Sequence, residues 1–197
     1  MRIGVLALQG AFREHRAIFH ELGIDAPEIR LPAQLEGLDG LVIPGGESTT
    51  IGKLATAFEL IEPLRVFGKS HAIWGTCAGA IFLSKDAHRE QPLLGLMRIK
   101  VNRNAFGRQV DSFETYLTVQ ELEDPERPFP ALFIRAPLIE SVGKGVQVIA
   151  RLPQEDPDQE GVIVGARQGK LLATSFHPEL TDDPRFHQYF LTMVEEG

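Results

Sequence analysis

The only cysteine of the chain, Cys77, stands in the pentapeptide Gly75-Thr76-Cys77-Ala78-Gly79, between two apolar runs. A nucleophile flanked at this spacing by small residues is typical of a sharp turn from a strand into a helix. A thiol at the start of a helix meets the positive end of the backbone dipole, which favours the reactive thiolate. The alternative is a buried, inert thiol, because free cysteine is among the most buried residue types. The small neighbours favour a nucleophile.

A thiol nucleophile needs a base, and the base needs an acceptor that orients it. His177 follows the apolar run 171–176, and the carboxyl ends of such strands line the crevice of an open α/β sheet. Glu179 lies two residues further and would point the same way in an extended chain, stiffened by Pro178. Taken alone, His177-Pro178-Glu179 is typical of an ordinary turn at the end of a strand. Together with Cys77, it indicates a Cys-His-Glu triad.

The other five of the six histidines are interpreted as structural or solvated residues. His71 is expected to begin a strand, and His88 and His187 to occupy solvated helix positions. His15 and His20 are five apart, which is the wrong spacing for a metal pair on a helix. No pattern of metal ligands is present, so we expect neither a metal nor another cofactor.

A second glycine loop, Pro44-Gly45-Gly46-Glu47-Ser48, follows an apolar run. It lacks the spacing of a phosphate-binding loop, and a glutamate facing the ligand would repel phosphate. The backbone N–H groups of Gly46 and of Ala78 are instead candidates for an oxyanion hole, because glycine allows close approach to a substrate. An ordinary turn from strand to helix explains the same residues equally well.

Arg103 and Arg135 both lie in stretches that read as loops. Either guanidinium is suited to gripping a carboxylate. Taken singly, each is more simply an exposed surface residue, since most arginines are exposed.

The composition describes an ordinary globular chain of 197 residues with a net charge of −7 and a pI near 5.4. This acidic balance argues against sequence-independent binding of nucleic acid. One cysteine excludes an internal disulfide framework and suits a reducing compartment. No signal peptide is recognisable and no stretch approaches the about 20 apolar residues of a membrane span. We expect a soluble cytoplasmic protein with one domain, residues 1–197, and no membrane partner.

The elements that must position these residues alternate in type through the first half of the chain. Apolar runs predict buried strands over residues 3–8, 38–43 and 71–74. Amphipathic patterns predict helices over residues 11–22, from 49 or 50 to 64, and from 80 onward. This alternation indicates a doubly wound α/β domain.

The second half changes character, with short predicted strands, some of them antiparallel, and a closing helix over residues 184–194. The strands are expected over residues 96–101, 114–120, 132–134, 146–152, 161–166 and 171–176. The polar segment 152–161 is interpreted as an exposed hairpin tip, and 123–130 as a similar loop.

Six segments read in order resemble one family. They are LALQGA at residues 6–11, PGGESTT at 44–50, GTCAG at 75–79, RNAFGRQVDSFE at 103–114, FIRAP at 133–137 and SFHPEL at 175–180. The chain resembles, over essentially its whole length, the glutaminase subunits of the pyridoxal 5'-phosphate synthase complex, which are class I (triad-type) glutamine amidotransferases. The GTCAG and SFHPEL segments fit any class I glutaminase, whereas the LALQGA, PGGESTT and RNAFGRQVDSFE segments narrow the resemblance to this family.

The resemblance implies a three-layer α/β/α flavodoxin-like domain, with a mostly parallel central sheet and added antiparallel strands in the second half. It implies Cys77 as the nucleophile, with His177 and Glu179 completing the triad. The residues implied to bind L-glutamine are Gly46, Glu47, Ser48, Arg103, Ile134 and Arg135. The acidic segment 154–160 and the loop 123–130 look longer than the family's usual turns, and Trp74 stands where a smaller aromatic is usual.

The resemblance further implies a hetero-oligomeric partner, the synthase subunit, which receives ammonia and holds the sugar phosphates. Gln9 is implied to lie near the oxyanion hole and the partner interface, in a region that rearranges when the synthase docks. Two alternatives stay open. One is a glutaminase for another amidotransferase, such as imidazole glycerol phosphate synthase, and the other is a non-catalytic regulatory module on the same fold.

Overall fold

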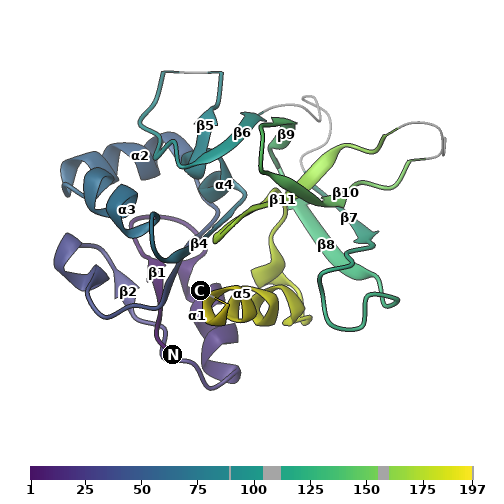
Figure 1. The fold of residues 1–197 in the computed structure, drawn as a ribbon, viewed down its shortest axis with the longest axis horizontal. Coiled ribbons are helices and arrows are strands. Elements are labelled where there is room, and N and C mark those ends of the chain that lie inside the picture. The colour runs from purple at the N-terminus through teal and green to yellow at the C-terminus, as the bar shows by residue number, and fades with distance from the viewer. Residues whose placement is uncertain (89, 104–111, 155–159, 197) are drawn as a thin grey trace.

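A long mixed sheet runs through the molecule, with helices on both faces of its N-terminal half (Figure 1). The computed structural model describes residues 1–88, 90–103, 112–154 and 160–196. The predicted three-layer α/β/α arrangement is confirmed. Residues 104–111 of the RNAFGRQVDSFE segment and 155–159 of the acidic segment lie outside the described residues.

Five parallel strands form the flavodoxin-like part of the sheet, in the order β2-β1-β3-β4-β12. Their bounds are Ile3–Leu6 for β1, Glu28–Ile29 for β2, Gly40–Ile43 for β3, Ala72–Thr76 for β4 and Leu171–Thr174 for β12. Every residue of β1, β3, β4 and β12 is buried, as expected for strands covered on both faces.

Antiparallel strands extend the sheet beyond β12, in the order β11-β9-β6, with β5 added in parallel at the edge and β10 paired to β11. Their bounds are Ser84–Asp86 (β5), Met97–Asn102 (β6), Leu138–Val142 (β9), Gln147–Arg151 (β10) and Ile163–Gln168 (β11). Strands β7 (Ser112–Leu117) and β8 (Phe129–Ile134) form a separate hairpin. The predicted antiparallel second half is therefore confirmed.

The helices divide between the two faces of the parallel strands (Figure 1). On one face lie α2 (Ser48–Ala57), α3 (Ile61–Phe67) and α4 (Ala78–Leu83), and on the other lie α1 (Phe12–Glu21) and α5 (Arg185–Glu195). Two short 3-10 helices, η1 (Pro32–Leu35) and η2 (Pro178–Leu180), complete the set among the described residues. Along β3, Leu41 and Ile43 join one core while Val42 joins the other, because side chains alternate across a strand.

The prediction of one helix from residue 49 or 50 to 64 is wrong, because the helix is interrupted between α2 and α3. Glu59 adopts a left-handed conformation with φ 56°. Its N–H donates to the Thr56 carbonyl, and the N–H of Leu60 donates to the Ala55 carbonyl. These two bonds close a helix end in the Schellman pattern, which usually has glycine at the left-handed position. Strands β2, β5 and β9 were not predicted either.

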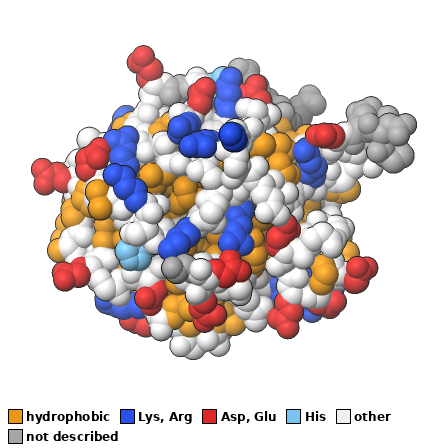
Figure 2. Space-filling model, viewed as in Figure 1, with side chains coloured by type: hydrophobic (Ala, Val, Ile, Leu, Met, Phe, Trp, Pro, Cys, Tyr) orange, Lys and Arg blue, Asp and Glu red, His pale blue; other side chains and the backbone are white. Residues whose placement is uncertain are grey.

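The surface on the side drawn in Figure 1 carries both acidic and basic side chains, with apolar residues between them (Figure 2). Within the described ranges, no helix is long and apolar enough to cross a membrane.

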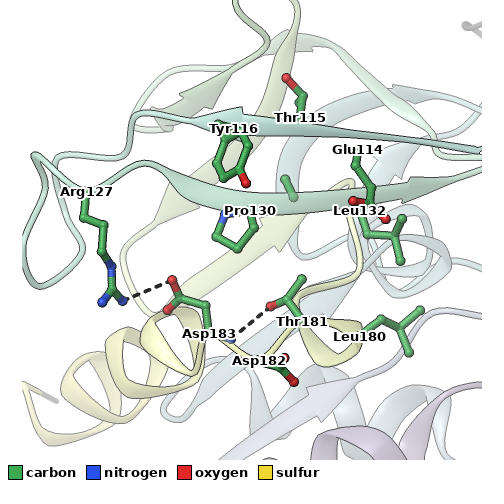
Figure 3. Close-up of a pocket in the computed structure, with 11 residues that line it drawn as sticks. Glu114, Thr115, Tyr116, Arg127, Pro130, Leu132, Leu180, Thr181, Asp182 and Asp183 are labelled. Atoms are coloured by element: carbon green, nitrogen blue, oxygen red, sulfur yellow. Dashed lines mark hydrogen bonds and ion pairs between the residues drawn. The ribbon is translucent and has the colours of Figure 1, made fainter.

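The predicted loop 123–130 ends at residue 128, directly before β8 begins, and a buried arginine at the start of α5 holds it in place. Arg185 donates to the backbone carbonyls of Glu123, Asp124, Arg127 and Pro128. Its guanidinium also pairs with both carboxylate oxygens of Asp183, at 3.0 and 2.7 Å. The half-exposed side chain of Arg127 reaches the same carboxylate at 3.2 Å, as the dashed line in Figure 3 marks. Both residues line a pocket of about 530 Å³ beside the β7–β8 hairpin.

We predict that Arg185→Leu lowers the free energy of unfolding by about 3 kcal/mol, because it leaves a buried carboxylate and several carbonyls without their donor. Urea denaturation measures this loss, and limited proteolysis should cut within 123–130 faster than in the wild type. The control is Arg127→Leu, whose half-exposed ion pair is worth about 1 kcal/mol or less. Equal losses for the two variants would contradict the assignment of Arg185 as the anchor.

Candidate active site

Cys77 sits on a strained backbone elbow between β4 and α4. Its φ of 48° and ψ of −108° are unusual for a residue with a side chain. A Cβ on Gly79 would lie 1.9 Å from the Ile43 carbonyl oxygen, and one on Gly75 would lie 2.5 Å from the Gly79 oxygen. Only glycine fits at either position. The Cys77 N–H donates to the Thr174 carbonyl at 2.8 Å, which ties the elbow to β12.

His177 and Glu179 reach the elbow from the segment after β12. The His177 N–H donates to the Leu132 carbonyl at 2.8 Å, and its Nδ1 donates to Glu179 Oε1 at 2.7 Å. An extended chain was expected here, but Glu179 lies within η2, so a tight turn brings the two side chains together. A Cβ on Gly45 would lie 2.5 Å from His177 Cε1 and 3.2 Å from Cys77 Cβ, so thiol and imidazole meet beside this glycine.

The surroundings of His177 favour a charged ring. Burial disfavours the imidazolium, but hydrogen bonding and charge from Cys77 and Glu179 outweigh it and raise the pKa of His177 to about 10. At neutral pH the ring is therefore an imidazolium that lies beside the sulfur.

A pocket of about 400 Å³ opens in front of the thiol. Its walls include all of the predicted site residues except Glu179, whose side chain is inaccessible to solvent. They are Gln9, Gly46, Glu47, Ser48, Cys77, Ala78, Arg103, Ile134, Arg135 and His177. Ile81 and Pro137 also line it and were not predicted. Arg135 has a φ of 43° and an exposed side chain, which places a cation at the rim.

The segment 9–11 and the glycine loop 44–48 are joined beside the pocket by hydrogen bonds of their backbones and of one side chain. Gln9 Oε1 accepts from the Glu47 N–H at 2.7 Å. The Gly45 carbonyl accepts from the Ala11 N–H at 3.0 Å. Gly10 has a φ of 97°, and a Cβ there would lie 1.7 Å from the Gly45 oxygen, so this close approach requires glycine.

Glu47 caps α2 and holds Arg103. Its carboxylate accepts from the N–H of Thr49 and of Thr50 and from the Thr50 hydroxyl, and Arg103 donates to it at 2.8 Å. Partial burial opposes the charge, but the bonds from Thr50, Thr49 and Arg103 outweigh it and lower the pKa of Glu47 to about 2. Gln91, which no sequence pattern indicated, accepts from Arg103 at 3.0 Å.

Two histidines without a role in the predicted triad are buried next to it. The prediction of a solvated His187 is wrong, because its side chain is completely buried in α5, as is that of His15 in α1. His15 Nε2 lies 3.3 Å from Glu179 Oε2. His88 is exposed as predicted but lies in a bend, where it pairs with Glu140. In the described part of the chain, no group of His, Cys, Asp and Glu side chains could hold a metal ion.

The model of the SNO glutamine amidotransferase family matches residues 5–196. The chain belongs to this family. A curated relative from Herpetosiphon aurantiacus, pyridoxal 5'-phosphate synthase subunit PdxT, is 55% identical over 97% of this chain and 99% of its own. The protein of the same name from Dehalococcoides mccartyi strain BAV1 is 53% identical over 99% and 98%.

Solved structures agree with this family assignment. A structure described as a glutamine amidotransferase superposes with a TM-score of 0.89 at 51% identity, covering 98% of each chain. A chain from the structure of PurLQS from Thermotoga maritima, at 16% identity and a TM-score of 0.69 over 98% of each chain, shares the fold. More distant chains thus share the fold of this family.

We predict that Glu47→Gln lowers the free energy of unfolding by about 1 kcal/mol at pH 7, because a charged helix cap is lost. The pKa of Glu47 is depressed from 4.5 to about 2 in the folded chain, so this stabilisation is full above pH 4.5 and fades as pH falls toward 2. Urea denaturation at pH 7 and pH 3 measures the difference. Glu36→Gln, at an exposed carboxylate, is the control, and an equal effect of Glu47→Gln at both pH values would contradict the prediction.

Proposed function

We propose that this protein is the glutaminase subunit of a pyridoxal 5'-phosphate synthase, with residues 1–197 acting as one glutaminase domain. The observation that carries the proposal is the thiol of Cys77 on its elbow beside a charged His177, whose Nδ1 donates to buried Glu179 at 2.7 Å. The names of the relatives support the pathway, since they are called pyridoxal 5'-phosphate synthase subunits.

The proposed chemistry begins with attack of the Cys77 thiolate on the side-chain amide carbon of L-glutamine. The C–S bond forms, and the negative charge moves to the former carbonyl oxygen. His177 gives its proton to the amide nitrogen, which leaves as ammonia while a γ-glutamyl thioester remains on Cys77. Neutral His177 then takes a proton from water, whose oxygen attacks the thioester and releases glutamate and the thiolate.

The backbone N–H groups of Gly46 and Ala78 are proposed to hold the oxyanion, at about 3–4 kcal/mol for each donor. Ala78 suits this role because the first N–H groups of a helix have no acceptor within the helix. Glu179 orients the imidazole and stabilises its charge.

The remaining pocket residues are proposed to bind the substrate. Arg135 at the rim and Arg103 suit the α-carboxylate of L-glutamine, and the Glu47 carboxylate suits its α-ammonium group. Gly46, Ser48 and Ile134 line the path of the substrate side chain. Arg103 is already paired with Glu47, which fixes its orientation before substrate arrives. The pocket of about 400 Å³ suits a small amino acid.

The proposed partner is the synthase subunit, which receives ammonia within a hetero-oligomer, and Gln9 is proposed to couple its docking to the pocket. Gln9 suits this role because its side chain accepts a hydrogen bond from the Glu47 N–H, and both residues line the same pocket as Cys77. A reactive thiol has to stay reduced, which the cytoplasm provides. A glutamate-release assay with and without the synthase subunit tests the assignment. Activation by an imidazole-glycerol-phosphate-forming cyclase instead would overturn the pathway.

We predict that Cys77→Ala abolishes glutamate release by the complex, because the thiol provides the atom that bonds to the substrate. The melting temperature should stay close to that of the wild type. His177→Asn should also abolish release, whereas Glu179→Gln should leave residual activity, because an orienting group contributes less than the base. Turnover of glutamine by Cys77→Ala would rule out the covalent route.

We also predict that His177 stays doubly protonated at pH 8. Its pKa is raised from 6.5 to about 10 on folding, so its contribution to stability is full below pH 6.5 and is lost as pH rises through 10. Long-range proton–nitrogen NMR of the imidazole measures the titration. In Cys77→Ala the pKa should fall, because one of the groups that favour the charge is gone, and an unchanged pKa would show that the sulfur does not pair with the ring.

A further inference from the structure

The second carboxylate oxygen of Glu179 faces a buried polar cluster that the triad does not use. His15 Nε2 lies 3.3 Å from Glu179 Oε2 and 3.2 Å from Thr76 Oγ1. On its other side, His15 Nδ1 lies 2.9 Å from His187 Nε2. His15, Thr76 and His187 are all completely buried. Helix α1 thus brings one imidazole up to the triad carboxylate, and α5 brings a second imidazole against the first.

Both imidazoles are neutral at neutral pH. Burial, with the nearby His187 and His177, holds the pKa of His15 well below its usual range, and burial lowers the pKa of His187 to about 3. A neutral imidazole carries one N–H and one acceptor nitrogen. The two rings therefore have two hydrogens to distribute over four nitrogens, and the partners of those nitrogens decide the distribution.

One distribution satisfies the cluster. With hydrogen on His187 Nε2 and on His15 Nε2, the first N–H donates to His15 Nδ1 and the second faces Glu179 Oε2 and Thr76 Oγ1. His187 Nδ1, which has no partner in the described chain, is then a bare acceptor. The reverse distribution would bury an unpaired N–H on His187 and turn a lone pair of His15 toward a carboxylate, and both are costly.

We propose that His15, as the Nε2–H tautomer, is the positioning residue of Glu179. This rests on the triad role proposed above for Glu179. Its Oε2 has no hydrogen bond of good geometry among the described residues, so the His15 N–H at 3.3 Å is the donor that the fold brings to it. Because His15 is neutral, it holds the carboxylate without cancelling the negative charge that stabilises His177.

Two substitutions at His15 separate positioning from packing. His15→Leu removes the N–H but still fills the buried space with an apolar side chain. His15→Gln places an amide N–H at about the position of Nε2. In the complex with the synthase subunit, we expect His15→Leu to lower kcat for glutamate release by about tenfold or more, because the buried carboxylate loses the only N–H that faces its second oxygen among the described residues. KM should change by less than about twofold, since His15 does not line the pocket, and His15→Gln should recover most of kcat.

The matched control is His20→Leu, at an exposed histidine of the same helix, which should keep wild-type rates. Equal losses of kcat in His15→Leu and His15→Gln, or no loss in His15→Leu, would overturn the proposal. NMR of wild-type protein labelled with ¹⁵N-histidine measures the tautomer of His15 directly, so this test does not depend on whether the variants fold. Hydrogen on His15 Nε2 supports the proposal, and hydrogen on Nδ1 overturns it. A wild-type complex that releases no glutamate would contradict the proposed function. The NMR experiment would still determine the tautomer of His15, so the two failures can be distinguished.

Discussion

The left-handed backbone of Cys77 is the constraint on which the site depends. A non-glycine residue at φ 48° is strained, and such strain persists only where the surroundings hold it. Here the backbone of Gly79 packs against the Ile43 carbonyl of β3, and the Cys77 N–H bonds to Thr174 of β12. Three neighbouring parallel strands, β3, β4 and β12, therefore fix the position of the Cys77 sulfur.

Burial of charge is the second constraint. The side chain of Glu179 is inaccessible to solvent, and a buried carboxylate is costly unless it is paired. It pairs with His177 through one oxygen and lies close to His15 of α1 through the other, so parts of the fold far apart in the chain offset that cost. The same arrangement keeps an imidazolium beside the thiol, so the pairing that offsets the burial of Glu179 also places a charged ring next to the sulfur that we propose as the nucleophile.

Short sequence patterns indicated the residues that line the pocket, but not the residues that support them. Cys77, His177 and the pocket residues stand in short local patterns, and local patterns are visible in a sequence. His15 and His187 are 172 residues apart and meet only because α1 and α5 share a face of the sheet, so no spacing reveals them. The break at Glu59 was missed because a glutamate fills a position where glycine is usual. Gln91 was missed because its side chain joins Arg103 through folding, not through proximity in the chain.

The solitary thiol has a further consequence for how the protein meets oxidants. A sulfenic acid formed on Cys77 has no second cysteine in the chain with which to condense. Recovery therefore depends on a small-molecule or protein thiol that enters the pocket from outside. For the same reason, any sulfhydryl-specific reagent that labels this polypeptide reports on one atom alone, at the floor of the pocket.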